Sequence, residues 1–132
     1  MLEVTFARND RNRCCAISAR GHADFAVHGK DVVCAAVSAI LQAARLGLTE
    51  YTRAEVAVRQ EPGELELRWP EDQSDLESVR AIAATAELAI DRIAQRFPKH
   101  VRLKRARVAR TLGRKGSERV TRLADRRRIY DV

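Results

Sequence analysis

The spacing of apolar residues constrains the fold of this chain most, because it changes twice from the spacing of strands to that of a helix. Apolar and polar residues alternate over residues 2 to 20 around a turn-forming run at 9 to 12, which predicts a β-hairpin. From Asp31 apolar residues recur every third or fourth position, which predicts a helix with Asp31 as N-cap and Gly47 as C-terminal stop. The first third of the chain therefore reads as two strands and a helix.

The same succession begins again after this helix. Residues 54 to 60 and 64 to 69 alternate between apolar and polar types, and the turn signal Glu61-Pro62-Gly63 separates them. This pattern predicts a second hairpin.

A second long helix follows the second hairpin. Ser74 and Glu77 have the spacing of a capping box, and an apolar stripe at helical spacing continues from there to Pro98. Val101 and Leu103 alternate with basic residues and predict a short final strand. The order β-β-α-β-β-α-β predicts an α+β single domain, with a mostly antiparallel sheet and both long helices on one side.

Positive charge is concentrated in the last part of the chain. The whole chain has a formal net charge of +7, but residues 1 to 105 hold 16 Lys and Arg against 15 Asp and Glu, a net of +1. Residues 106 to 132 hold nine Lys and Arg against three acidic residues, a net of +6. We therefore expect a domain over 1 to 105 and a basic C-terminal extension over 106 to 132, disordered or loosely helical.

The cysteine content and the N-terminus indicate a reducing compartment. The chain has three cysteines and no Cys-x-x-Cys spacing, so neither a disulfide framework nor a zinc ribbon is expected. The first residues do not resemble a secretion signal, and no segment approaches the roughly 20 apolar residues that span a bilayer. We expect a cytoplasmic protein with no membrane contact.

A long loop links the second strand to the first helix. It covers residues 21 to 31, eleven positions where about four to six are usual, and long ordered loops often carry function. Gly21 and Gly29 allow backbone conformations closed to other residues and are candidate hinges for His22. Cys34 occupies the third helical position, where the helix dipole favours a thiolate and free backbone amides could hold an oxyanion. His22 and Cys34 are therefore a candidate nucleophilic pair.

The same residues have other interpretations. Cys34 lies among small apolar residues, so packing alone would explain it. A zinc site of His22, His28 and Cys34 is disfavoured, because the spacing matches no paired motif and a fourth ligand is missing. A phosphate cradle is disfavoured because Gly21 and Gly29 are far apart. The remaining candidates are read as structural or surface residues: Cys14, Cys15, His28 and His100.

The motif Gly21-His22-Ala23, followed by Gly29-x-Asp31-x-Val33-Cys34-Ala35-Ala36-Val37-Ser38, resembles the signature of the bacterial ribosomal-processing cysteine proteases, the Prp family. The element order predicted to about residue 105 is also similar to the domain of that family. The resemblance implies a cysteine endopeptidase that removes a short N-terminal extension from a large-subunit ribosomal protein, number twenty-seven in bacterial nomenclature.

The resemblance also implies roles for individual residues. Cys34 would be the nucleophile and His22 the general base, with Asp31 and Ser38 at further family positions. Asp24 and Asp31 are both candidates for orienting the imidazole. The resemblance also implies a homodimer and no cofactor.

The basic extension departs from the family pattern, which ends near the last strand. It is read either as a solvated tail or as a segment attracted to ribosomal RNA. A rival function for the whole chain is a non-enzymatic ribosome- or RNA-associated binding module that uses this tail.

Overall fold

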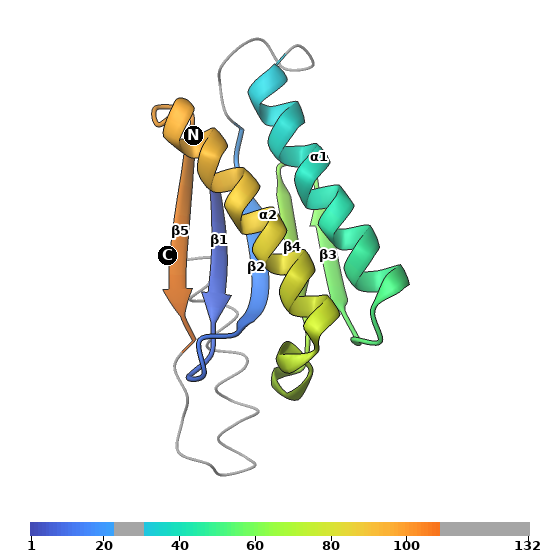
Figure 1. The fold of residues 1–132 in the computed structure, drawn as a ribbon. Helices are drawn as coiled ribbons and strands as arrows, with labels where there is room; N and C mark the ends of the chain where they lie inside the picture. Colours follow the sequence, from blue (N-terminus) through green and yellow to red (C-terminus); the bar gives the residue numbers. More distant parts are fainter. Residues whose placement is uncertain (23–30, 109–132) are drawn as a thin grey trace.

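The computed structural model describes residues 1–22 and 31–108 (Figure 1). The elements are, in order, β1 (Leu2–Arg8), β2 (Cys14–Arg20), α1 (Val32–Leu46), η1 (Gly47–Tyr51), β3 (Ala57–Glu61), β4 (Glu64–Arg68), η2 (Glu71–Asp75), α2 (Glu77–Arg96) and β5 (Val101–Arg107). The strands form one sheet in the order β3-β4-β2-β1-β5, and only the pairing of β1 with β5 is parallel among these strands. Both long helices lie on one face of the sheet (Figure 1), so the predicted α+β fold is confirmed.

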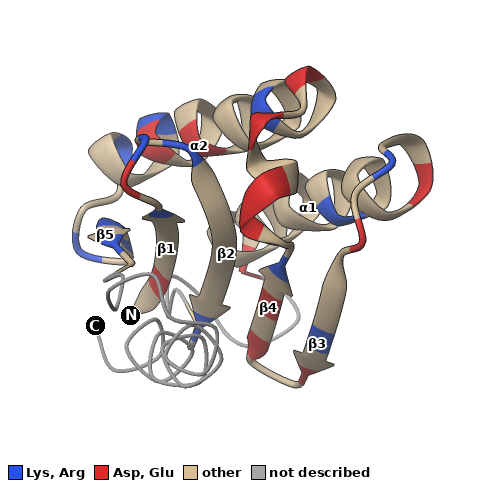
Figure 2. Cartoon of the chain, turned by 90° about the horizontal axis from the view of Figure 1, so that it is seen from below, with Lys and Arg blue, Asp and Glu red and all other residues tan. Residues whose placement is uncertain are grey.

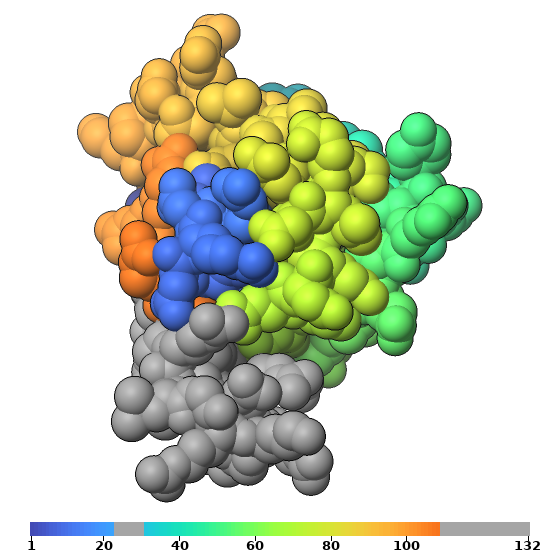
Figure 3. Space-filling view, turned by 60° about the horizontal axis from the view of Figure 1, so that its bottom comes forward, coloured from blue at the N-terminus to red at the C-terminus, as the bar shows by residue number. Residues whose placement is uncertain are grey.

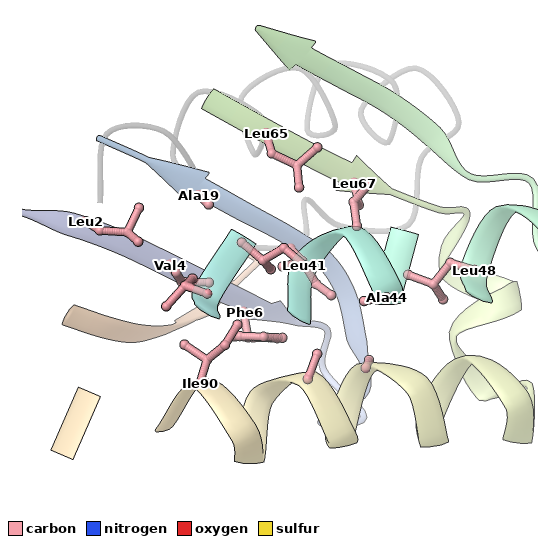
Figure 4. Close-up of a cluster of buried hydrophobic side chains, with 14 of the residues drawn as sticks. Leu2, Val4, Phe6, Ala19, Leu41, Ala44, Leu48, Leu65, Leu67 and Ile90 are labelled. Atoms are coloured by element: carbon pink, nitrogen blue, oxygen red, sulfur yellow. The ribbon is translucent and has the colours of Figure 1, made fainter. Parts of the chain in front are cut away.

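The core fills the space between the sheet and the two helices (Figure 4). Phe6, Ile17 and Leu67 form one row across β1, β2 and β4, since Phe6 pairs with Ile17 and Ile17 with Leu67. Leu48 and Ile90 are fully buried as well and come from η1 and α2. The row shows how the alternation seen in the sequence places one side of each strand in the core.

An ion-pair cluster joins α2 to strands β1 and β5 of the sheet. The buried Glu87 carboxylate accepts hydrogen bonds from Arg8 of β1 and Arg105 of β5, each at 2.7 Å. Arg105 also lies 3.8 Å from Asp91, one turn further along α2.

The strand β5 continues to Arg107, two residues past the predicted domain boundary.

The first α-helix starts and ends where predicted, but helical backbone continues beyond its end. Gly47 keeps helical dihedral angles, and the chain continues as the π-helical segment η1 to Tyr51, closed by a bond from the Thr52 amide to the Gly47 carbonyl. A Cβ atom on Gly47 would lie 3.0 Å from Cδ1 of Ile82 in α2. The α-helix thus ends at Leu46 with Gly47 as its C-cap, as predicted, and a Cβ atom at position 47 would make a tight contact with the Ile82 side chain.

The segment Val32–Tyr51 is long and apolar enough to cross a membrane by length and composition, with a mean hydropathy of 1.7. The expectation that no segment approaches a membrane span is therefore wrong on these two measures, because alanines extend the apolar character around the helix. Its inward residues, including Val33, Val37 and Leu41, belong to the core. Since core helices meet the same criterion, it is weak evidence for a membrane span.

The predicted capping box at Ser74 is absent from the structure. Ser74 lies in η2, while α2 begins at Glu77 after Leu76, which makes no side-chain cap. The buried Ser74 hydroxyl donates to the Glu71 carbonyl and accepts a bond of 3.0 Å from Nδ2 of Asn9. Figure 3 shows the β1–β2 turn lying against this part of the chain. Ser74 therefore joins two segments far apart in sequence.

The second hairpin is shorter at its start than predicted. β3 begins at Ala57 instead of residue 54, and Glu61 belongs to the strand, so the turn consists of Pro62 and Gly63 alone. All five residues of β3, which lies at an edge of the sheet, are exposed. The alternating pattern overestimated its burial, since Val58 remains 38% exposed.

Candidate active site

The N-terminus of α1 presents Cys34 in the predicted third helical position. Asp31 is the N-cap, and its Oδ1 accepts a hydrogen bond of 2.9 Å from the Cys34 backbone N–H. The Asp31 carbonyl accepts the next amide, that of Ala35, at 3.0 Å. The cap thereby fixes the backbone that carries the Cys34 thiol. Cys34 itself is half-buried at the edge of the core.

The end of β2 is fastened to the tip of the second hairpin. The Gly21 amide donates to the Gly63 carbonyl at 2.9 Å. Gly21 has φ +92°, and a Cβ atom there would lie 2.4 Å from the Met1 carbonyl oxygen, so only glycine fits. The positive φ expected at Gly21 is present. The next residue, His22, is exposed and directly follows this fixed point of the backbone.

His22 lies over the Pro62-Gly63 turn. Gly63 has φ +74°, and a methyl group on it would lie 3.3 Å from Nε2 of His22. The glycine in this turn therefore leaves space for the imidazole as well as allowing the backbone conformation.

His22 and Cys34 line the same cavity, which has a volume of about 490 Å³. One wall is α1, where Cys34 and Ser38 are four residues, about one helical turn, apart, and the other wall is the hairpin segment 60–65. Asp31 caps the helix turn that carries Cys34. The structure thus brings together four predicted residues: His22, Asp31, Cys34 and Ser38. Gly29, His28 and Asp24 lie outside the described residues.

The inner part of the cavity is apolar. Leu2, Ala19 and Leu65 come from neighbouring strands of the sheet, and Val37 and Leu41 come from α1. Figure 4 shows Leu2, Ala19 and Leu65 across three strands, with Leu41 on the helix that faces them. The cavity therefore combines the half-buried Cys34 thiol with a hydrophobic lining.

An amide bridge spans the cavity walls. Nε2 of Gln42 in α1 donates to Oε1 of Gln60 in β3 at 3.2 Å, and Gln42 accepts from Arg45 at 3.2 Å. This pair, the hairpin tip and Leu2 were not predicted as parts of the site, because nothing in their local spacing links them to Cys34. Only the Pro-Gly turn carried a recognisable signal.

One part of the sequence-based chemistry needs correction. The first turn of α1 was expected to offer free amides to an oxyanion, but the Cys34 amide binds the Asp31 carboxylate and the Ala35 amide binds the Asp31 carbonyl. These two amides are the ones nearest the thiol in sequence, so the N-cap occupies them. Asp31 thereby positions the backbone of Cys34.

The other cysteines lie elsewhere. Cys14 packs against the main core, and Cys15 packs against Ala7 and Ala16. Burial raises the pKa of the Cys14 thiol to about 12, and the neighbouring Cys15 adds to the shift. Within residues 1–22 and 31–108, no group of three or more His, Cys, Asp or Glu side chains could hold a metal ion.

Comparison with known protein families decides the classification. The sequence profile described as cysteine protease Prp matches residues 1–102, more than three quarters of the chain. The chain belongs to the Prp cysteine protease family. It is accordingly an enzyme, a cysteine peptidase. A search of curated proteins finds no match.

Solved structures of similar fold include Prp from S. aureus. The complex of that protease with a covalently linked product peptide gives a TM-score of 0.74 at 22% identity, covering 80% of this chain and 99% of the other. Its complex with a substrate peptide gives 0.70 at 21% identity with the same coverage. SMU.848 from Streptococcus mutans gives 0.69 at 23% identity, covering 81% and 98%. These likenesses support the fold.

Proposed function

We propose that this Prp family member is an endopeptidase that removes a short N-terminal extension from the precursor of large-subunit ribosomal protein twenty-seven. The observation that carries the proposal is that Cys34, at the start of a capped helix, shares one cavity with His22. The S. aureus relative is described as a ribosomal processing protease and was solved with substrate and product peptides, which supports this substrate class.

The reaction proposed for these residues is acyl transfer. His22 takes the proton from the Cys34 thiol, and the sulfur attacks the scissile carbonyl carbon to form a C–S bond. Collapse of the tetrahedral adduct breaks the C–N bond, and the leaving amine takes the proton back from His22. Water, deprotonated by His22, then attacks the thioester and releases the new carboxylate and the thiol. No cofactor takes part.

Asp31 and Ser38 support this reaction in different ways. Asp31 holds the backbone of Cys34 through its carboxylate. Ser38 lies about one helical turn beyond Cys34 and lines the same cavity, so we assign it a contact with the bound substrate. Gly21 gives the His22 segment its fixed starting point.

The surroundings of the enzyme are also part of the proposal. We place it in the cytoplasm, where three free thiols persist. It works as a homodimer, for which the outer side of α1, free of charged residues between Asp31 and Arg45, offers an apolar surface. Residues 106 to 132 add an electrostatic contact to ribosomal RNA, as their net charge of +6 favours.

The test is cleavage of a peptide that spans the precursor junction. We expect Cys34→Ala to lower kcat/KM by about 10⁴-fold or more and His22→Ala by about 10²- to 10⁴-fold, because one loses the nucleophile and the other its base. Cys15→Ala and His100→Ala are the matched controls and should cleave at the wild-type rate. Full activity in either of the first two variants removes that residue from the mechanism.

A further inference from the structure

One edge of the folded domain carries an excess of positive charge. Residues 1 to 91 hold ten Lys and Arg against 15 Asp and Glu, whereas residues 92 to 107 hold seven Lys and Arg and no acidic residue. We propose that residues 92 to 107, called the basic edge below, form a binding surface for the phosphate groups of RNA. The surface belongs to the folded domain and shares only Arg107 with the basic extension. The choice of RNA as the partner rests on the proposed function.

The basic edge is continuous in space. It consists of the end of α2, the turn at 97–100 and the edge strand β5. Figure 1 shows β5 and the end of α2 next to each other at one side of the molecule, and Arg105 of β5 donates to Glu87 of α2 at 2.7 Å. In Figure 2, β5 and the turn that leads into it carry blue and no red. The strand alone extends over about 20 Å, since a strand rises about 3.3 Å per residue.

Part of this charge is offset within the domain. Arg102 and Lys104 lie 3.5 and 3.4 Å from the same carboxylate, that of Glu3. Arg105 binds Glu87, which also binds Arg8 of β1. The carboxylates that contact the basic edge are Glu3, Glu87 and Asp91. Because two of them are shared between cations, this part of the edge keeps a positive charge.

The remaining cations of the basic edge are available to an external anion. Arg92, Arg96, Lys99 and Arg107 are exposed and form no ion pair with the described part of the chain. Arg92 and Arg96 are about one helical turn apart, and Lys99 follows in the next turn of the chain. A bound anion would therefore meet three cations near the end of α2 without displacing an internal carboxylate.

The side chains of the basic edge suit phosphate groups better than a membrane. Five of the seven cations are arginines, whose paired N–H donors match phosphate oxygens. Between residues 92 and 107, all of which the structure describes, no large hydrophobic side chain is exposed. Surfaces that bind bilayers combine basic residues with exposed apolar ones, so a bilayer is disfavoured. The ring of Phe97 is half-buried, so we expect contacts to RNA phosphates rather than stacking on bases.

The basic edge lies away from the catalytic cavity. The strand order β3-β4-β2-β1-β5 places β5 at one edge of the sheet and the hairpin that lines the cavity at the other. None of residues 92 to 107 lines that cavity. The enzyme could therefore hold RNA and cleave a peptide at the same time.

Two variants of the full chain with equal net charge test the surface. The edge variant carries Arg92→Gln, Arg96→Gln and Lys99→Gln. The control variant removes three exposed cations elsewhere, through Arg11→Gln, Arg53→Gln and Arg80→Gln. Binding to a fluorescent oligouridine is measured by anisotropy between about 50 and 200 mM salt.

The edge variant should bind RNA more weakly than the control variant. We expect its affinity to be at least about 10-fold below that of the wild type, and the slope of log affinity against log salt to shrink by about two, because each lost phosphate contact removes about 0.7. The control variant should stay within about 3-fold of the wild type. Equal RNA affinities of the two variants, both with wild-type Tm values, overturn the basic edge as a binding surface.

Vesicles of phosphatidylcholine and phosphatidylserine in equal parts test the other source of phosphate groups. If the edge variant loses affinity for these vesicles but binds RNA as well as the control variant does, the partner is a bilayer and the RNA proposal is wrong. Vesicle binding that is equally weak for the wild type and both variants supports RNA.

Peptide cleavage separates this inference from the proposed function. The edge variant should cleave the precursor-junction peptide at the wild-type rate, because its substitutions lie away from the cavity. If the wild type cleaves no such peptide while the edge variant still binds RNA at least about 10-fold more weakly than the control variant, the proposed substrate is wrong and the binding surface stands.

Discussion

At the scale of single residues, the environments of the three cysteines differ in a way that their spacing does not show. Cys34 lies at the start of a capped helix beside a cavity. Cys14 is packed against the core, where desolvation makes its thiolate unfavourable. Burial, with a smaller effect from Cys15, raises the pKa of Cys14 to about 12. Cys14 therefore remains a thiol wherever the folded enzyme is active, and its effect appears only in alkali.

Stability should fall in alkali because of Cys14. Above a pKa of 9.0 the thiol of the unfolded chain loses a proton that the folded chain retains up to a pKa of about 12. The contribution of Cys14 to the free energy of unfolding is fully present below pH 9. Between pH 9 and about 12 the free energy of unfolding declines by about 1.4 kcal/mol per pH unit. In urea unfolding at pH 8 and pH 10, Cys14→Val should lose about 1.4 kcal/mol less than the wild type. Equal losses in both proteins would contradict the assigned shift.

Gly63 is predicted to matter for His22 as well as for the turn. In Gly63→Ala the new methyl group would lie 3.3 Å from Nε2 of His22, so the ring must move. We expect kcat/KM to fall by about 10-fold or more, since small displacements of catalytic groups are costly. Asn12→Ala is the matched control, because Asn12 also has positive φ, at +61°, but lies in the β1–β2 turn. Its stability should drop similarly, by about 1 kcal/mol, with activity retained.

At the scale of elements, the structure is held by contacts between segments that the sequence pattern treats as independent. The Asn9 side chain accepts from the amides of Arg11 and Arg13 within its own turn and donates to Ser74 of η2. Arg11 and Arg13 also pair with Asp75, at 2.7 and 3.1 Å. The first hairpin therefore positions the start of α2.

A double-mutant cycle should detect this link. Ser74→Ala leaves a buried Asn9 amide without its acceptor, at a cost of about 1 to 3 kcal/mol. In Asn9→Ala, the further effect of Ser74→Ala should shrink, giving a coupling free energy of about 1 kcal/mol in urea unfolding. Ser74 acting as a helix cap would instead cost the same whether or not Asn9 is present, and additive losses would support that alternative.

At the scale of the whole molecule, a nearly neutral folded domain precedes a strongly basic segment. The family profile and the cavity both fall within residues 1–102, so catalysis should not require the basic segment. Its proposed partner is RNA, and its proposed effect is on location rather than on chemistry. The proposed homodimer belongs to the same scale.

A variant that ends at Val108 tests both proposals. In sedimentation velocity the full chain and the variant should each show dimers, the full chain at twice the 14.9 kDa of one chain. The full chain should bind single-stranded RNA with an affinity that falls steeply between about 50 and 200 mM salt, while the variant binds weakly and cleaves normally. Equal RNA affinity for both proteins would exclude the basic segment as the contact, and a monomeric full chain would exclude the dimer.

Much of the fold was predictable because its signals are local. The alternation over residues 2 to 20 and the helical spacing after Asp31 each depend on neighbours within a few positions, and both predictions are confirmed. The prediction for Ser74 failed because its hydroxyl contacts Asn9, which is far away in sequence, whereas the local pattern assigned Ser74 the role of a helix cap.

In the candidate site, too, the local motifs were predictable from the sequence and their arrangement in space was not. By itself the sequence determined two short motifs, one that ends a strand with Gly21 and His22 and one that opens a capped helix with Cys34, because glycine conformation and helix capping act within a few residues. Only the tertiary structure decided that these motifs line one cavity, together with the hydrogen-bonded pair Gln42 and Gln60. That arrangement depends on the order of strands in the sheet and on how the helices pack over it, and those follow from burying the whole core at once.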